Sequence, residues 1–550
     1  MAPVDIETQP RYLPLVLVGL RIVSATYASL TVGRSLYRSH KALGPAQDTR
    51  HRSAERSKLT IAFGSLAALG LVFAVTSSLG HLTLSYKVWA SERGIEPLTA
   101  GSLFGNSTLS TKDAMREAGV HLARWLSDTP IYVDALEIVA EKTRRLWWGQ
   151  QLDLATVSWT ALLAIEGRRR RIPHLWAYSV LPHLVSLSFA QNLFHVAMLQ
   201  APVPMPTQET RLARLAHRLL PKKPKNWLPR LSLIVVPLIF YYAALLWLPI
   251  AAGKPTFPAT VALAKLFSLA ALILPAVAPA SWGHVYSDPR DVYPGISKLF
   301  SVISAASGLI YAKTTVSAVL YNLPGSHKHR HSIKIPFDTV KRSKWERTAT
   351  AAEKILDSLT DHPVVAGAGK DALLCALSLG LWAAVRGTDV GIMLRQVLPI
   401  PKLLRRAASK AASTHVPKAE PTDLEEPPSH HAPGFSMRLR HRGRPTKTSV
   451  SSISSFEAPT EDTHQTPRRR GRPRKVKLKP EPEPDLELDE GPGDETYKPT
   501  PAVKADIGLA DVLPEDDFDW ESASLAWGLT VLGGLGVGSA AVYGAECISR

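Results

Sequence analysis

Cysteine is nearly absent from this sequence, which has only Cys375 and Cys547 among its 550 residues. Two thiols build neither a disulfide framework nor a thiolate zinc site. Both lie in apolar segments, where a free cysteine packs as a small hydrophobic residue. The N-terminus also lacks the basic stretch that begins a signal peptide, and Arg21 interrupts its apolar run. We therefore expect the first apolar segment to remain as an uncleaved membrane anchor.

The sequence also lacks the short motifs of common catalytic sites. It contains no Walker loop, no nucleophile elbow, no HExxH zinc motif and no carboxylate pair at a useful spacing. The histidine tract from His327 to His331 has no carboxylate or cysteine beside it, so it predicts no metal site. We predict no catalytic residue, no metal and no cofactor.

Long apolar segments are what the chain does have. Lys and Arg total 65 against 47 Asp and Glu, and the charges gather between apolar blocks of about 20 residues. This alternation is typical of a multi-pass membrane protein. We predict an all-α, multi-pass transmembrane helical bundle of eight or nine spans with a long disordered C-terminal tail. The spans are expected at 12–32, 59–84, 147–165, 174–199, 231–252, 257–278, 298–320, 371–385 and 524–545.

Composition divides the chain into three regions. Residues 1–400 form the predicted transmembrane region, with a helical lumenal loop at about 85–146. Residues 401–521 are rich in Pro, Ser, Thr and charge, which predicts disorder because such a segment cannot bury a core. Residues 522–550 form a predicted Gly-rich transmembrane segment. There Gly534 and Gly538 have the spacing of close helix–helix contacts, and a loosely packed tail anchor is the alternative.

Two segments leave alternatives open. The eighth predicted span, 371–385, is short for a bilayer, so it is either a span or a re-entrant or interfacial segment. The fourth, 174–199, separates the four arginines at 168–171 from another basic loop at 201–230. Since basic loops favour one side of a membrane, either one loop is misplaced or the fourth segment is not a simple span.

The first loops predict an orientation. Seven basic residues between the first two spans stand against Asp48 and Glu55, and the positive-inside rule assigns this loop and residues 168–171 to the cytosol. The loop between the second and third spans carries Asn106 in an Asn-Ser-Thr sequon. We predict that Asn106 is a lumenal glycosylation site and that the N-terminus is also lumenal.

Polar residues within the predicted spans are candidate functional groups, because lipid does not solvate them. One set shares an arc about 100° wide on the fourth segment: Ser188, Gln191, Asn192 and His195. With Asp153 of the third segment, this set would line a polar cavity. The alternative is hydrogen bonding between helices that fixes their packing. Lys265, in the sixth span, needs a carboxylate, a cavity or a route to the interface.

The predicted tail contains two copies of one basic motif. They are Arg442, Gly443, Arg444 and Pro445, and then Arg470, Gly471, Arg472 and Pro473. Both resemble the AT-hook, which reads the minor groove of A·T-rich DNA. Glycine lets the backbone approach the groove floor, proline keeps the exit extended, and the narrow A·T groove attracts arginine. The first copy has thinner basic flanks. A nuclear localisation signal or a polybasic membrane patch is the competing interpretation.

The predicted membrane region has a resemblance of its own. The stretches WWGQQLDLATVSW, EGRRRRIPHLW and LVSLSFAQNLF resemble a group of multi-pass membrane proteins of filamentous fungi. That resemblance supplies no activity or substrate. We expect an integral membrane protein of the endoplasmic reticulum or nuclear envelope, whose body contacts the lipid bilayer and whose tail binds A·T-rich DNA. The alternative is a transporter or membrane-embedded enzyme that uses the polar set of the third and fourth segments.

Overall fold

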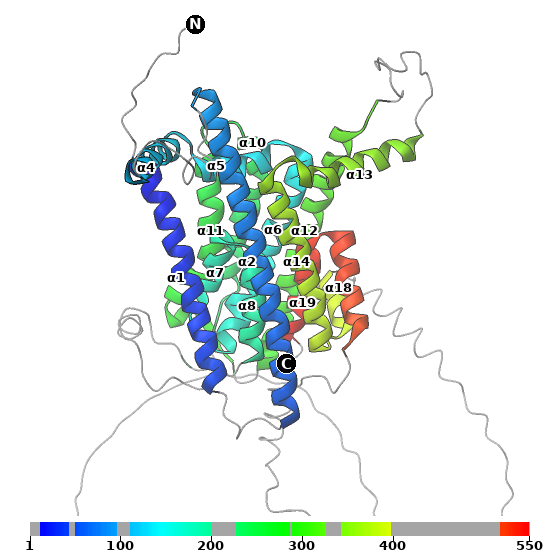
Figure 1. The fold of residues 1–550 in the computed structure, drawn as a ribbon. Helices are drawn as coiled ribbons and strands as arrows, with labels where there is room; N and C mark the ends of the chain where they lie inside the picture. Colours follow the sequence, from blue (N-terminus) through cyan, green and yellow to red (C-terminus); the bar gives the residue numbers. More distant parts are fainter. Residues whose placement is uncertain are drawn as a thin grey trace, which may run out of the picture. The chain divides into compact units, whose positions relative to one another are not determined.

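The computed structural model describes the helical body of the protein and little else. The described residues are 12–42, 50–95, 111–200, 224, 227–286, 289–325, 343–397 and 518–548. They are almost entirely helical, which confirms the all-α prediction (Figure 1). The predicted tail lies outside the described residues except at its last few positions, so its disorder stays a prediction.

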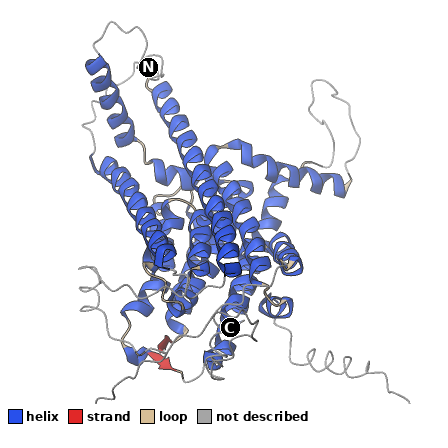
Figure 2. Ribbon diagram, turned by 60° about the horizontal axis from the view of Figure 1, so that its bottom comes forward, coloured by secondary structure: helices blue, strands red, loops and turns tan. Residues whose placement is uncertain are grey.

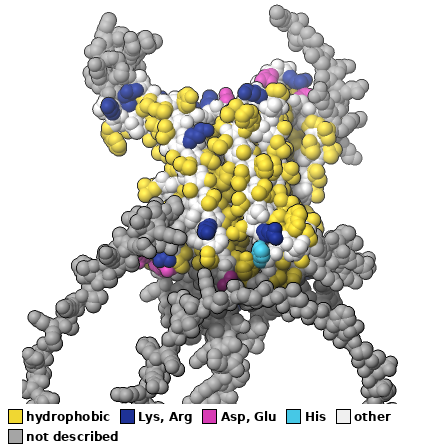
Figure 3. Space-filling view, turned by 180° about the vertical axis from the view of Figure 1, so that it is seen from behind, with side chains coloured by type: hydrophobic (Ala, Val, Ile, Leu, Met, Phe, Trp, Pro, Cys, Tyr) yellow, Lys and Arg dark blue, Asp and Glu magenta, His cyan; other side chains and the backbone are white. Residues whose placement is uncertain are grey.

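Six of the described helices are long and apolar enough to cross a membrane. They are α1 (Tyr12–Ala42), α2 (Arg50–Glu92), α10 (Ser232–Ala251), α11 (Phe257–Val277), α12 (Tyr293–Asn322) and α14 (Pro363–Arg386). Their outer faces expose large apolar side chains, with Val23 65%, Ile61 68% and Leu309 74% exposed. Apolar side chains cover the middle of one face, and most of its charged side chains lie toward the two ends (Figure 3). A bilayer would cover such a surface.

The two ends of the bundle carry different elements. Three helices lie at the end drawn uppermost in Figure 1: the polar α4 (Thr111–Asp128) and α13 (Lys344–Asp361), and the short α5 (Ile131–Glu141). We call this the α13 end. At the opposite end, the short helix α15 (Val390–Val397) follows α14 and packs on the start of α12, where Ser301 Oγ donates to Arg395 O over 3.3 Å. We call this the α15 end.

The third predicted span is the central helix of the bundle. It forms α6 (Thr143–Leu162) and continues into a π-helical turn, η2 (Leu163–Gly167). Neighbouring helices bury Gln150, Gln151 and all of its residues from Leu154 to Leu162. The two glutamine side chains therefore do not face lipid. This explains why α6 crosses the body although it is less apolar than the helices around it.

The fourth predicted span is wrong as a single span, because residues 174–199 form two short helices. They are α7 (Leu175–Leu184) and α8 (Leu187–Leu199), of 10 and 13 residues. At about 1.5 Å per residue, each is shorter than the roughly 30 Å hydrocarbon layer. The outer ends of both helices meet at the end of η2. There Leu175 packs on Gly167, and Arg170 Nη1 donates to Met198 O over 3.3 Å. The pair is therefore a hairpin that enters and leaves at the α15 end.

The ninth predicted span is wrong for the same reason. Residues 520–548 form α18 (Trp520–Gly533) and α19 (Leu535–Ile548), each of 14 residues. Both outer ends contact the same end of α14: Ser522 Oγ donates to Ala383 O over 3.0 Å, and Arg386 Nε lies 3.0 Å from Glu546. Gly534 has a φ of 83° and makes the turn between the helices. This segment is a second hairpin that enters from the α15 end.

The eighth predicted span proves to be a long helix. α14 has 24 residues and begins upstream of the predicted boundary, at Pro363. His362 caps it, because its Nδ1 accepts from Val364 N over 3.2 Å. The charged residues Lys370 and Asp371 interrupt the apolar run, so the hydropathy pattern did not predict the part of the helix before them. At about 36 Å, α14 is long enough to cross a bilayer.

The described strands form one small sheet at the α15 end. β1 (Trp227–Pro229) and β2 (Gly283–Val285) pair antiparallel, with Leu228 opposite His284 (Figure 2). β1 precedes α10 and β2 follows α11, so the sheet ties the two ends of this helical pair together.

We expect Gly534→Ala to destabilise the body by about 1–3 kcal/mol, because alanine is strained at this φ. Its Cβ would also meet the Tyr311 ring, 2.7 Å from the nearest carbon. Gly528→Ala is the matched control, since nothing lies within 4 Å of a Cβ there and helical alanine is favourable. The free energy of unfolding in detergent micelles measures both. Equal stability of the two variants would mean that the turn at Gly534 is not constrained.

Candidate functional site

A buried cluster of ion pairs lies where the helices meet at the α15 end. Glu166 and Glu546 are fully buried, and Arg170 is 6% exposed. Arg170 pairs with both carboxylates, at 3.0 Å to Glu166. Arg386 holds the second oxygen of Glu546 at 3.0 Å, and Arg169 pairs with Glu166. We call these five residues the Arg170 cluster. It joins the end of α6, the end of α14 and the end of α19.

The arginines at 168–171 were predicted to form a cytosolic loop. Three of them reach into the helical body, and their cytosolic side stays a prediction. Arg168 Nη2 donates to Leu272 O over 2.5 Å, Arg169 Nη1 donates to Cys547 O over 3.2 Å, and Arg170 belongs to the cluster. The sequence signal that was missed is Glu546, a single carboxylate in an apolar segment, which needs a cation when buried.

A second buried carboxylate caps the inner end of α8. Asp371 of α14 accepts from Leu187 N over 3.0 Å and from Ser188 N over 2.9 Å. A helix N-terminus carries unpaired N–H groups and partial positive charge, so a carboxylate is well placed there. At the C-terminal end of α7, Arg21 Nη2 donates to Leu184 O over 3.3 Å. The α7–α8 turn therefore has an opposite charge at each helix end.

The predicted polar set on α8 is buried as predicted, but most of its members make packing contacts. Gln191 Nε2 donates to Ser378 Oγ over 3.1 Å, and Asn192 Nδ2 donates to Ser188 O over 2.8 Å. Ser188 lies beside Asp371. Gln191 and Ser188 contact α14 and fit the alternative in which hydrogen bonds fix the packing of helices, whereas Asn192 bonds within α8.

His195 is the exception in that set. Its ring stacks on Trp382, with centroids 4.4 Å apart and planes 6° apart, and it meets the edge of Phe63 at 5.1 Å. It is fully buried, and neither ring nitrogen has a hydrogen-bond partner among the residues that the structure describes. His195 packs here as an aromatic ring.

Asp153 does not join the α8 set. It faces α10 and α11, where Tyr241 Oη donates to Asp153 O over 3.3 Å and Lys265 interacts electrostatically with the carboxylate. The structure therefore brings together Asp153 and Lys265, two residues that the sequence left unconnected. Asp153 is thus the carboxylate that interacts with Lys265 within the body, without a direct ion pair between them in the described structure. His183 Nε2 lies 3.2 Å from Ser268 Oγ on the same side of the body.

Gly534 and Gly538 make contacts within the chain. Gly538 packs against Thr530 across the α18–α19 hairpin, and Gly534 lies against Tyr311 and Gln151. Gln151 Oε1 also accepts from Leu535 N over 2.8 Å, at the start of α19. Association of two chains through these glycines stays a prediction. Cys375 and Cys547 are both buried and free, as expected.

At the α13 end an ion pair lies near the surface. Arg144 and Arg145 both contact Asp361, at 2.6 and 3.3 Å. Partial burial alone would raise the pKa of Asp361, but the hydrogen bonds and charges of the two arginines outweigh it and hold that pKa below its usual value. This pair links the start of α6 to the end of α13.

Several predicted sites fall outside the described residues. They are Asn106, both AT-hook-like motifs (Arg442–Pro445 and Arg470–Pro473) and the histidine tract at 327–331. Among the residues that the structure does describe, no three His, Cys, Asp or Glu side chains are grouped to hold a metal ion. Comparison with protein-family models, curated proteins and solved structures finds no match.

We expect Glu546→Gln to destabilise the body by about 3–5 kcal/mol, because it removes the counter-ion of Arg386 and one of the two counter-ions of the buried Arg170. Asp361→Asn is the control, since an ion pair near the surface contributes about 0–1 kcal/mol. Denaturant unfolding in micelles measures both variants. A loss at Glu546 no larger than the loss at Asp361 would contradict a structural role for the Arg170 cluster.

Proposed function

We propose that this is an integral membrane protein of the endoplasmic reticulum or nuclear envelope whose tail binds A·T-rich DNA on the cytosolic or nucleoplasmic side. The observation that carries the proposal is the α7–α8 hairpin. If residues 174–199 crossed the membrane, every later segment would change sides, and a chain of nine spans would put the tail in the lumen. The hairpin keeps the tail on the side of the first basic loop.

The arrangement of the helices supports one topology. The six apolar helices and α6 give seven crossings, with the N-terminus at the α13 end. The basic loops at 33–58, 168–171 and 201–230 then all belong to the α15 end, which removes the conflict in the charge pattern. The loop at 323–343 carries five Lys and Arg residues and belongs to the α13 end, but the loops at 33–58 and 201–230 carry seven each. The positive-inside rule therefore favours a cytosolic α15 end.

The tail is attached to the body at both of its ends. α15 packs on α12, and Asp519 N donates to Ala384 O over 3.2 Å just before α18 begins. Residues 398–517 are thus a long loop that starts and finishes at the α15 end. In the proposed topology, both AT-hook-like motifs are on the side of the membrane where DNA is accessible.

Two motifs in one loop favour binding to DNA over a chance basic run. Their cores are about 28 residues apart, which a flexible chain spans at roughly 30 Å, or about nine base pairs. Both motifs can therefore engage one A·T-rich region, and the second binding event benefits from the first. Arg470 and Arg472 would enter the groove, and the flanking Lys and Arg side chains would contact phosphates.

A second candidate function rests on a different observation. Two short-helix hairpins enter the body from the same end, and Asp153 and Lys265 interact within the membrane region. Interrupted helices that end inside a bundle are a common framework for solute sites in transporters. A transporter or membrane-embedded enzyme would lose function on Asp153→Asn and keep it when residues 438–479 are deleted. The DNA-binding function has the opposite dependence.

We expect cysteine labelling of sealed microsomes to follow the proposed topology. Thr210→Cys and Ser452→Cys should react with a membrane-impermeant maleimide, because both lie in loops of the cytosolic side. Thr99→Cys should react only after permeabilisation, and Asn106, in the same lumenal segment, should carry a glycan. The native cysteines are buried, so the unsubstituted chain gives the background. Protection of Thr210→Cys in sealed vesicles would overturn the topology.

We expect the full-length protein in lipid nanodiscs to prefer A·T-rich over G·C-rich duplex of equal length. If about half of the basic residues at 468–479 contact phosphates, affinity should fall with salt at a log–log slope on the order of −4. Replacing Arg470 and Arg472 with Ala should remove the A·T preference. Replacing Lys477 and Lys479 should weaken both duplexes alike and flatten the salt slope. Equal binding of both duplexes by the unsubstituted protein would rule out groove reading.

A further inference from the structure

α13 lies across the α13 end of the body, and part of it extends beyond the helices that it touches (Figure 1). Its buried side chains lie in one narrow strip: Ala351, Ile355 and Ser358. Trp148 Nε1 donates to Ile355 O over 3.1 Å, and Ser358 Oγ donates to Arg144 O over 3.2 Å. These contacts fix the C-terminal half of α13 on the start of α6.

The N-terminal part and the middle of α13 are hydrogen-bonded to the end of α12. Arg347 Nε donates to Pro324 O over 3.1 Å, and Lys354 Nζ donates to Asn322 O over 3.5 Å. Ser343 caps the helix through a 3.1 Å bond from Glu346 N to its Oγ. The direction in which α13 leaves the body is therefore set by bonds at both halves.

A second strip on α13 is apolar and exposed. Four apolar residues at helical spacing (Trp345, Ala349, Ala352 and Leu356) line most of a shallow hollow of about 460 Å³, and Thr348, Glu353 and Asp357 complete its rim. Trp345 is 80% exposed and Leu356 is 59% exposed. Exposing large apolar side chains such as Trp345 and Leu356 to water is unfavourable in free energy, so we expect a partner to cover the strip.

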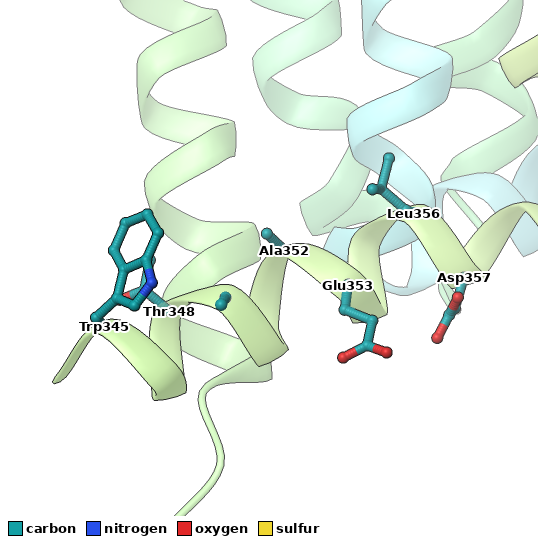
Figure 4. Close-up of a pocket in the computed structure, with 7 residues that line it drawn as sticks. Trp345, Thr348, Ala352, Glu353, Leu356 and Asp357 are labelled. Atoms are coloured by element: carbon teal, nitrogen blue, oxygen red, sulfur yellow. The ribbon is translucent and has the colours of Figure 1, made fainter. Parts of the chain in front are cut away.

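The orientation of this strip points to the partner. Trp345 and Leu356 project toward the side of α13 on which the body's helices lie, whereas Glu353 and Asp357 project the other way (Figure 4). α13 contacts Asn322 and Pro324 at the end of α12, and this end of α12 also carries exposed apolar side chains, with Leu320 61% and Tyr321 81% exposed. The exposed apolar side chains of α13 and of the end of α12 therefore lie on neighbouring helices, and a bilayer would cover both.

We propose that α13 is an interfacial helix whose Trp345–Leu356 strip is inserted into the lipid leaflet at the α13 end. A helix with one apolar and one acidic face lies in the plane of the interface, and tryptophan is favoured at that depth. α13 carries four acidic residues (Glu346, Glu353, Asp357 and Asp361) against three basic ones (Lys344, Arg347 and Lys354), so it has no excess of positive charge to attract anionic lipid, and the occupant is the acyl boundary of a neutral lipid. The proposal rests on integral insertion of the body and does not depend on the tail.

Spin labels on the full-length protein in phosphatidylcholine nanodiscs test this proposal. Single cysteines replace Trp345 and Ala349 on the strip, and Glu353 and Asp357 on the acidic face as matched controls. Collision with oxygen, which partitions into lipid, is compared with collision with a water-soluble nickel chelate. We expect oxygen to dominate at Trp345→Cys and Ala349→Cys by severalfold, and the chelate to dominate at Glu353→Cys and Asp357→Cys.

Two results would overturn the proposal. Access of the chelate to Trp345→Cys and Ala349→Cys as high as to Asp357→Cys would mean that the strip stays in water. Exclusion of both reagents from the strip would mean that protein covers it, for example a second copy of this chain. Neither result bears on DNA binding, so a failure here is distinguishable from a failure of the tail to bind DNA.

Discussion

The pairing of buried charges around Arg170 is the constraint on which the rest of the body depends. A guanidinium removed from water must find counter-ions and acceptors, and Arg170 finds them on three different elements. It pairs with Glu166 at the end of α6, pairs with Glu546 at the end of α19, and donates to Met198 O at the end of α8. One side chain thus fixes the outer ends of both hairpins against the central helix. Arg386 extends the same contact to α14.

The inner ends of the hairpins are stabilised differently. Short helices that stop inside a membrane leave N–H and C=O groups unpaired, which is costly in lipid. At the α7–α8 turn, Asp371 satisfies the N–H groups and Arg21 satisfies a carbonyl, each with the charge that suits its end of the helix. At the α18–α19 turn the partners are neutral: Gln151 accepts from Leu535 N, and Tyr311 donates to Val531 O. Gly534 makes the second turn at a positive φ, which glycine adopts without the steric cost that a Cβ would add.

Hydropathy predicted the helical class and the six apolar helices, because each of those depends on its own residues meeting lipid. It failed where a residue's partner is distant in the sequence. Asp371 looked like the boundary of a short span, yet it lies inside α14 and caps α8. The same holds for the polar set on α8. Its spacing predicted one face correctly, but only the packed structure separates Gln191, bonded to Ser378, from Asp153, which faces Lys265.

The arginines at 168–171 illustrate that a basic run marks the side of a membrane best when its charges are unpaired. Basic residues mark the cytosolic side because they resist translocation as free charges, whereas Arg170 is held by two carboxylates within the body. The sidedness of this protein therefore depends more on whether α7–α8 crosses than on how many arginines precede it. Removing that one crossing reverses every segment from 201 to 517 and carries the two AT-hook-like motifs with it. The α18–α19 hairpin, which also fails to cross, then returns the end of α19 to the same side as the motifs. In the proposed topology, the α7–α8 hairpin, whose outer end Arg170 holds through Met198 O, thus decides which compartment the tail enters.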